Sequence, residues 1–255
     1  WQGDSSRDGT LDNAIVAHEW GHYLSNRLTN GGMYANNQGR GMGEGWSDFF
    51  ALMLMVRETD QLLPGNDNWQ ATYNAGGYAV SGSLVENGYF FGIRRAPYST
   101  DMKHNAMTFK HIEYQVALPT SHPISSHHDD INTMAGSYNA SVHSSGEIWA
   151  LMLWEAYTSL LNRDGVSFSD VQSRMMDYMV ASMKITPVSP TFNEARDALL
   201  AVAFANDVND FNAMAAAFAK RGLGIGAVSP SRFDLDHAGV VESFDALAVS
   251  VSVDS

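Results

Sequence analysis

The sequence predicts a mainly α fold, and three observations indicate this class. Residues 44–57 are apolar nearly all round, which is the composition of a buried helix. Residues 169–184 place apolar side chains at helical spacing, and Thr191 with Glu194 forms a capping box that opens another helix. Because 45% of the 255 residues are hydrophobic, such helices can enclose one ordinary core.

Two helices are expected in the N-terminal part of the chain. The first runs over 13–28, with Asp12 or Asn13 as its cap, and Asn30 followed by two glycines ends it. The Gly- and Asn-rich stretch that follows, up to residue 43, predicts a loop. The second helix then begins at Glu44 and runs over 44–57.

The middle of the chain is less regular. Residues 61–98 are rich in Gly, Asn and Tyr and predict long loops with a short strand or hairpin. Residues 97–128 predict short helical pieces separated by polar turns. A third long helix is expected to begin near Gly146 and to end around Asn162.

The second half is strongly helical. In 169–184 the methionines form a stripe at helical spacing, which indicates a core face rather than a cofactor site. Further helices are expected over 195–206 and from about 210 to 222, where two basic residues and a glycine mark the end. Beyond residue 227 the chain predicts a tail or linker, in which 247–253 is an edge strand or the start of a linker.

Composition excludes several classes of partner and site. The net charge of −13 repels phosphate backbones and anionic lipid, so we expect no nucleic acid and no membrane as partner. The longest apolar run, 49–56, is too short to span a bilayer. Since cysteine is absent, any metal must be bound by histidine or carboxylate.

A histidine motif on the first predicted helix indicates a metal site. Residues 18–22 read His-Glu-x-x-His, and on a helix positions i and i+4 lie about 40° apart, so both imidazoles share one face. His18 and His22 are therefore candidate zinc ligands. Glu19 lies beside them, where a carboxylate can take a proton from a zinc-activated water. The alternative is a chance match with two surface histidines.

A catalytic zinc usually needs a third protein ligand, and the second helix offers one. Glu44 is the candidate third ligand. Asp48 follows one turn later, so it can accept the free ring N–H of a ligating histidine and fix its tautomer. The alternative for both carboxylates is that they only decorate the N-terminus of a helix, where the helix dipole favours anions.

These motifs, in this order, resemble the fungalysin (elastinolytic) family of metallopeptidases, which are thermolysin-like gluzincins. The resemblance covers most of residues 7–160. The matching strings are residues 7–13 (RDGTLDN), 18–28 (HEWGHYLSNRL), 41–50 (GMGEGWSDFF), 97–101 (PYSTD) and 142–149 (VHSSGEIW).

The resemblance implies a zinc endopeptidase with one Zn²⁺, secreted and acting on extracellular proteins or peptides. It implies that Glu19 is the general base and later the proton donor, and that His143 stabilises the oxyanion. Arg94, or equally Arg95, would bind a substrate carbonyl. The implied fold is the helical C-terminal part of a thermolysin-like zincin catalytic domain over 1–227, with the zinc-motif helix packed on the third-ligand helix.

The sequence also departs from the family pattern. Thermolysin-like enzymes have a mostly β half before the zinc helix, whereas about a dozen residues precede it here, and no aspartate in 138–141 is placed to orient His143. A propeptide or N-terminal half of the same precursor is therefore an expected partner. The alternative function is a zinc-binding but inactive module or half-domain, and a third reading is a helical interaction domain with fortuitous motifs. Residues 127–130 (HHDD) predict a solvated loop rather than a second metal site.

Overall fold

The computed structural model describes residues 7–81, 86–128 and 130–250. These residues form a mainly α fold, as predicted, and their β pairing is limited to isolated bridges, Tyr73–Tyr98, Leu223–Ser243 and Val228–Val241. The long helices are α1 (Asn13–Leu28), α2 (Asn37–Met55), α6 (Val142–Leu161), α7 (Phe168–Ile185), α8 (Phe192–Asn206) and α9 (Val208–Lys220). The short helices are α3 (Gly77–Val80), α4 (Gly88–Phe91) and α5 (Ile131–Met134). Among the described helices, none combines the length and the apolar composition that a bilayer crossing needs.

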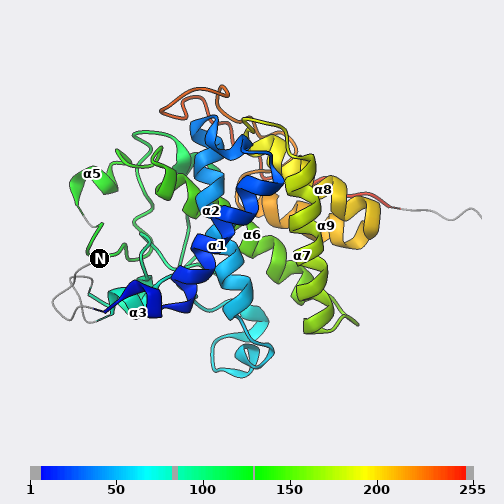
Figure 1. Ribbon diagram of the computed structural model, residues 1–255, viewed down its shortest axis with the longest axis horizontal. Helices are drawn as coiled ribbons and strands as arrows, with labels where there is room; N and C mark the ends of the chain where they lie inside the picture. Colours follow the sequence, from blue (N-terminus) through cyan, green and yellow to red (C-terminus); the bar gives the residue numbers. More distant parts are fainter. Residues whose placement is uncertain (1–6, 82–85, 129, 251–255) are drawn as a thin grey trace, which may run out of the picture.

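Helix α2 lies between α1 and α6, and α6 packs in turn against α9. Helices α7, α8 and α9 form a group on one side of this stack, while the loop-rich region with α3 and α5 lies on the other side (Figure 1). Helix α6 is buried on nearly every side, and Trp149 and Trp154 within it are fully inaccessible to solvent. The core therefore surrounds α6, and α1 lies on the outside of the stack.

Local sequence signals place several helices where they were expected. The side chain of Asp12 accepts a hydrogen bond from the Ala14 N–H and caps α1. Thr191 and Glu194 form the predicted capping box at the start of α8. The apolar stripe of α7 is buried, at Val171, Met175, Met179 and Met183. These predictions are confirmed. They were possible from the sequence because each depends on residues within one or two helical turns.

The predicted start of the second helix is wrong. Helix α2 begins at Asn37, seven residues before Glu44, and its cap is Asn36, whose side chain accepts from the Gly39 N–H at 3.0 Å. The glycines that suggested a loop are required by close packing instead. A Cβ at Gly41 would lie 2.3 Å from Ser145 Oγ, and one at Gly45 would lie 2.5 Å from the Gly146 carbonyl oxygen. Contact with α6 thus offsets the low helix propensity of glycine.

The third long helix also begins earlier than predicted. Helix α6 begins at Val142, and the hydroxyl of its cap, Ser141, accepts from the Ser144 N–H. Both of these early turns lie where α2 and α6 meet, so long-range packing decides the two helix starts. His143 consequently lies in the first turn of a helix rather than in a loop.

The segments predicted as loops are mostly irregular. Residues 61–98 contain 3₁₀ turns, α3 and α4, and the predicted strand or hairpin is reduced to the Tyr73–Tyr98 bridge. At the C-terminal end, the Val228–Val241 bridge closes residues 228–243 on themselves, and the Leu223–Ser243 bridge joins this segment to the residues that follow α9. Residues 247–250 form no regular structure, and 251–253 of the predicted edge strand lie outside the described residues. The boundary between 1–227 and 228–255 stays a prediction.

Candidate metal centre

The two histidines of the motif lie on one face of α1 and point toward α2. His18 is buried and His22 is half-buried, and their ring centroids are 4.8 Å apart in an edge-to-face arrangement. Gly21 lies between them in sequence and faces α2, where a Cβ would come within 2.6 Å of Ser47 Cα. The two helices therefore approach closely at this point, and a side chain from α2 can reach both imidazoles.

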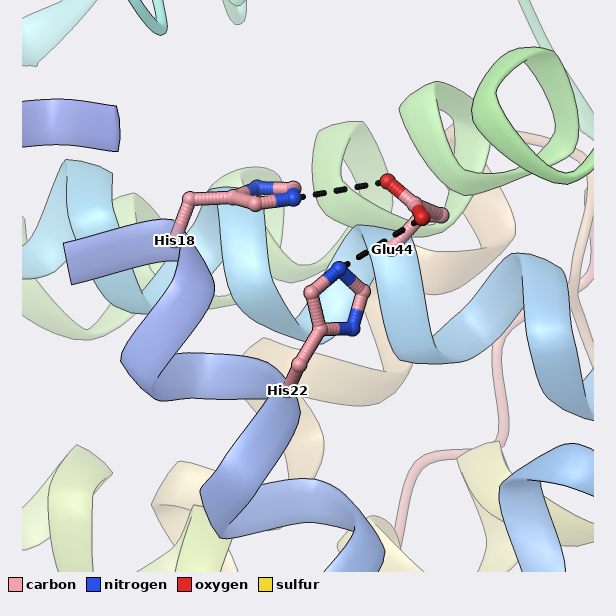
Figure 2. A group of neighbouring side chains, drawn as sticks. All are labelled: His18, His22 and Glu44. Atoms are coloured by element: carbon pink, nitrogen blue, oxygen red, sulfur yellow. Dashed lines mark ion pairs between the residues drawn. The ribbon is translucent and has the colours of Figure 1, made fainter. Parts of the chain in front are cut away.

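Glu44 is the side chain that reaches both imidazoles. Its Oε2 lies 3.4 Å from His18 Nε2, and its Oε1 lies 3.4 Å from His22 Nε2 (Figure 2). One donor atom from each of the three residues lies within 4.8 Å of the others, and they form the one such metal-competent group found in the described residues. Glu44 lies on the third turn of α2, so the interpretation that it decorates a helix N-terminus is wrong.

The donor set fits a divalent metal ion of the zinc type. Two imidazole nitrogens and one carboxylate are the ligands of many catalytic zinc sites and leave a position for water. Glu44 Oε2 is buried and makes only long ion-pair contacts, with His18 Nε2 at 3.4 Å and Arg94 Nη2 at 3.5 Å, but no hydrogen bond, which is costly for a carboxylate oxygen. A cation held between Glu44, His18 and His22 would satisfy this atom.

Behind His18, a buried aspartate orients the imidazole. His18 Nδ1 lies 2.7 Å from Asp48 Oδ1, and Asp48 is fully buried. Arg94 binds the same carboxylate with two hydrogen bonds, from Nε at 2.6 Å and from Nη2 at 2.8 Å, and the Tyr98 hydroxyl donates to it as well. The contact from Asp48 leaves Nε2 of His18 facing Glu44, which is the arrangement that a ligating histidine needs.

The charges in this cluster are strongly coupled. Burial opposes ionisation of Asp48, but Arg94 and His18 outweigh it and hold the pKa of Asp48 well below its usual range. Burial likewise opposes ionisation of Glu44, yet both imidazoles and Arg94 hold its pKa below its usual range. Burial lowers the pKa of His18, but its contacts with the Asp48 and Glu44 carboxylates raise it to about 9. Since metal ligation needs a neutral imidazole, a metal ion must displace this proton.

The donor atoms open into a cavity of about 560 Å³. Glu19 is exposed and lines the cavity beside the two histidines. His143, from the first turn of α6, lines it from the opposite helix, and its Nε2 lies 3.6 Å from Glu44 Oε1. The side chain of His143 is 68% exposed.

The two arginine candidates are separated by the structure. Arg94 lines the cavity, although its Nε and Nη2 already donate to Asp48. Arg95 points elsewhere, because its guanidinium donates to Glu147, to Asn139 and to the Ser144 carbonyl, and it does not line this cavity. Of the two, Arg94 is the one that lines the cavity with the three donor residues.

Sequence reasoning missed three contributors to the site. Tyr98 belongs to a matching string, but nothing in the sequence pairs it with Asp48. His127 and His128 were expected in a solvated loop; His127 is exposed, whereas His128 is half-buried, and both line the cavity. Asp129 lies outside the described residues. No spacing rule joins these residues to the motif on α1, since the contacts are long-range.

Comparison with known proteins extends over most of the chain. The model of a family described as fungalysin metallopeptidase (M36) matches residues 1–227. The extracellular metalloproteinase mep of Aspergillus fumigatus is 34% identical over 244 residues, which cover 89% of this chain and 32% of that protein. The extracellular metalloproteinase mep of Aspergillus niger is 32% identical over 244 residues, which again cover 89% of this chain and 32% of that protein. Extracellular metalloproteinase 2 of Trichophyton tonsurans is 31% identical over 236 residues, 86% of this chain and 31% of its own. The chain thus spans about a third of the length of these relatives.

Proposed function

This chain belongs to the fungalysin metallopeptidase family, and from that premise we propose that it carries the catalytic helices of a zinc-dependent endopeptidase. One observation carries the proposal. His18, His22 and Glu44 bring three donor atoms within 4.8 Å, at the wall of a cavity that Glu19 also lines. We propose proteins and peptides as substrates, because a metal site beside an open cavity can receive an extended chain. We propose that they are extracellular, because the relatives are named extracellular metalloproteinases.

In this proposal, Glu19 and Asp48 have separate roles at the metal site. When bound, a zinc ion supplies a Lewis acid that polarises the scissile carbonyl and lowers the pKa of the attacking water. Glu19 accepts a proton from that water on its carboxylate and later delivers it to the leaving amide nitrogen. Asp48 holds the His18 ring so that Nε2 faces the metal position.

His143 is the proposed oxyanion donor. Negative charge develops on the carbonyl oxygen during attack, and a donor aimed at that oxygen stabilises the transition state. His143 Nε2 lies 3.6 Å from Glu44 Oε1, which places the ring beside the metal position while leaving it exposed to the cavity. For Arg94 we propose that holding Asp48 is its first role and that substrate binding is secondary, because two of its nitrogen atoms already donate to that carboxylate.

We also propose that an upstream part of the same precursor, a propeptide or N-terminal half, contacts this chain. The support is an exposed apolar face on α1. Val16, Trp20 and Tyr23 are each more than half exposed and lie on one side of the helix, and Trp20 stacks on Phe50 of α2 at 5.9 Å. Exposed apolar patches of this kind mark contact surfaces. The relatives are about three times longer than this chain, so such a partner has room in the precursor.

Secretion is the proposed location. The relatives carry names that describe them as extracellular metalloproteinases. The described helices include none that could cross a membrane.

Zinc content and casein cleavage, measured together on this 255-residue chain with and without a chelator, test the function. We expect one zinc per chain and cleavage that the chelator stops. One zinc without cleavage would support the alternative, a half-domain that needs an upstream segment, and absence of zinc would refute the ligand assignment.

Glu19→Gln is the variant that tests the proposed base. It should keep one zinc per chain and lose roughly 10²- to 10⁴-fold in kcat, because only the proton acceptor is removed. Full activity of this variant would refute the role of Glu19. Glu58→Gln, on an exposed residue outside the cavity lining, is the matched control and should change neither quantity.

A further inference from the structure

The first turn of α2 is bound by a segment near the C-terminal end of the chain. We name residues 228–243 the C-terminal clasp; Figure 1 shows this part of the chain, in orange, passing over the start of α2. Asn36 donates from its side-chain amide to the Arg232 carbonyl at 2.9 Å. Gln38 donates to the carbonyls of Pro230 and Ser231 at 3.2 and 3.1 Å. The helix that carries Glu44 is thus held at its start by the backbone of the clasp.

Asn37, between these two residues, joins the clasp to a third element. Its side-chain amide donates to the Leu235 carbonyl at 3.0 Å and to the Ala140 carbonyl at 2.8 Å. It also lies 3.2 Å from Nε2 of His237. Ala140 directly precedes Ser141, the cap of α6, and is three residues before His143. One amide therefore connects the start of α2, the start of α6 and the clasp.

His237 makes the clasp side of this connection rigid. It is fully buried, and its Nδ1 lies 3.2 Å from the Ile112 carbonyl oxygen, to which it can only donate. Its Nε2 then carries no proton and lies 3.2 Å from the Asn37 amide nitrogen, whose two N–H groups are shared among this ring nitrogen and the carbonyls of Leu235 and Ala140. The backbone at His237 has φ +54°, a left-handed conformation that persists where surrounding contacts enforce it.

The clasp is anchored independently of α2. Arg232 binds Glu194 at the start of α8 with two hydrogen bonds, at 2.8 and 2.6 Å. The backbone N–H groups of Gly239 and Val240 donate to the Glu113 carboxylate at 3.1 Å each. Since these anchors fix the clasp to other parts of the fold, the clasp can restrain Asn37 rather than follow it.

We propose that Asn37, held by the clasp through Leu235 and His237, is a positioning residue that fixes the start of α6 and so sets where His143 lies over the metal site. The inference rests on the proposed function for the role of His143. Glu44 is seven residues, about 10 Å, further along α2, where two close contacts restrain the helix, Gly21 of α1 on Ser47 and Gly146 of α6 on Glu44 itself. Loosening Asn37 therefore displaces His143 more than the metal donors.

Asn37→Ala tests the proposal, with Asn212→Ala as the matched control. Both asparagines are half-buried and donate to a carbonyl near the C-terminal end of the chain, but Asn212, on α9, binds Val249 and makes no contact with α6 through this amide. Amide hydrogen exchange at Ser144 and Ser145 should rise about tenfold in Asn37→Ala and stay unchanged in Asn212→Ala, because one hydrogen bond to the α6 start is lost. Equal exchange at these amides in the two variants would overturn the proposal.

Zinc content and kinetics give the second readout. Asn37→Ala should keep one zinc per chain, while kcat falls by up to roughly 10²-fold with little change in KM, as expected when a transition-state donor is displaced by about 1 Å. A loss of zinc with unchanged exchange at Ser144 would contradict the assignment. A wild-type chain without zinc would instead refute the proposed function, and the exchange measurement would still decide the positioning role.

A second variant keeps the test decisive if Asn37→Ala does not fold. His237→Asn retains a donor toward Ile112 and tolerates the left-handed backbone, but it removes Nε2, which lies 3.2 Å from the Asn37 amide and is one of the three groups that restrain it. We expect a smaller rise of exchange at the same amides of α6. Unchanged exchange at Ser144 and Ser145 in a folded His237→Asn protein would overturn the proposal.

Discussion

Two buried aspartates in this molecule have similar hydrogen-bond partners, but only one of them lies beside the candidate metal site. Asp48, between α1 and α2, binds Arg94, the Tyr98 hydroxyl and His18. Asp210, on α9, is 1% exposed and binds Arg163, Arg174 and the Tyr178 hydroxyl. Both carboxylates are thus held by guanidinium and phenol groups.

The difference lies in what each cluster leaves open. The Asp210 cluster is closed, because within the described part of the chain the carboxylates that its arginines bind are Asp210 and the neighbouring Asp207. The Asp48 cluster continues through the second nitrogen of His18 to Glu44, whose Oε2 is buried without a hydrogen-bond partner. A buried carboxylate network is therefore no sign of a site by itself, and the unsatisfied acceptor beside a cavity is what distinguishes one.

The largest expected effect is the loss of zinc affinity when the Glu44 carboxylate is removed. Glu44→Ala deletes one of three donors and should weaken zinc binding by more than the roughly 10- to 100-fold typical of an outer partner of a ligand. Zinc affinity measured by chelator competition checks this. Unchanged zinc affinity would mean that the Glu44 carboxylate is not a ligand.

Asp48→Asn and Asp210→Asn compare the two clusters directly. Asp48→Asn should reduce the free energy of unfolding by about 3–5 kcal/mol, because buried Arg94 loses the charge of its buried partner. Asp210→Asn should reduce it by less, because Arg163 and Arg174 are half-buried and keep Asp207 as a charge partner. Only Asp48→Asn should also weaken zinc binding, by roughly 10- to 100-fold, since it alone contacts a candidate ligand. Denaturant titration and chelator competition on both variants separate the two effects. Equal zinc affinity in both variants would show that Asp48 does not support the metal site.

A pH titration gives the smallest and most specific effect. In the metal-free protein the pKa of His18 is raised to about 9 from 6.5, so the folded state binds an extra proton between these values. This stabilisation is complete below pH 6.5 and is lost as pH rises through 9, a decrease of up to about 3 kcal/mol in the free energy of unfolding. Urea denaturation at several pH values measures it.

Zinc provides the control for the titration. A bound metal ion replaces the His18 proton, so the decrease between pH 6.5 and 9 should disappear in the zinc-loaded protein. The Asp210→Asn variant should retain the decrease when metal-free, because its cluster does not contact His18. A metal-free stability that stays flat over this range would contradict the coupling of His18 to Asp48 and Glu44.

Much of this molecule could be predicted from local sequence. Residues a few positions apart determine the mainly α class, the Asp12 cap of α1, the capping box of α8 and the methionine stripe of α7. Their spacing in the sequence therefore predicts these features. The motif on α1 likewise put His18 and His22 on one face, and with Glu44 they converge in the structure. Their role as metal ligands, and the roles of Glu19, His143 and Asp48, stay predictions.

The tertiary structure alone decided the rest. Glycine content argued against helix at 37–43, yet these residues are helical, and α6 approaches so closely that a side chain at Gly41 would collide with Ser145. The pairing of Tyr98 and Arg94 with Asp48, and of the clasp with Asn37, joins residues far apart in the chain. Local propensity is worth about 1 kcal/mol per residue, which burial and long-range hydrogen bonds readily exceed, so sequence spacing determines a helix and its motif but not what packs against them.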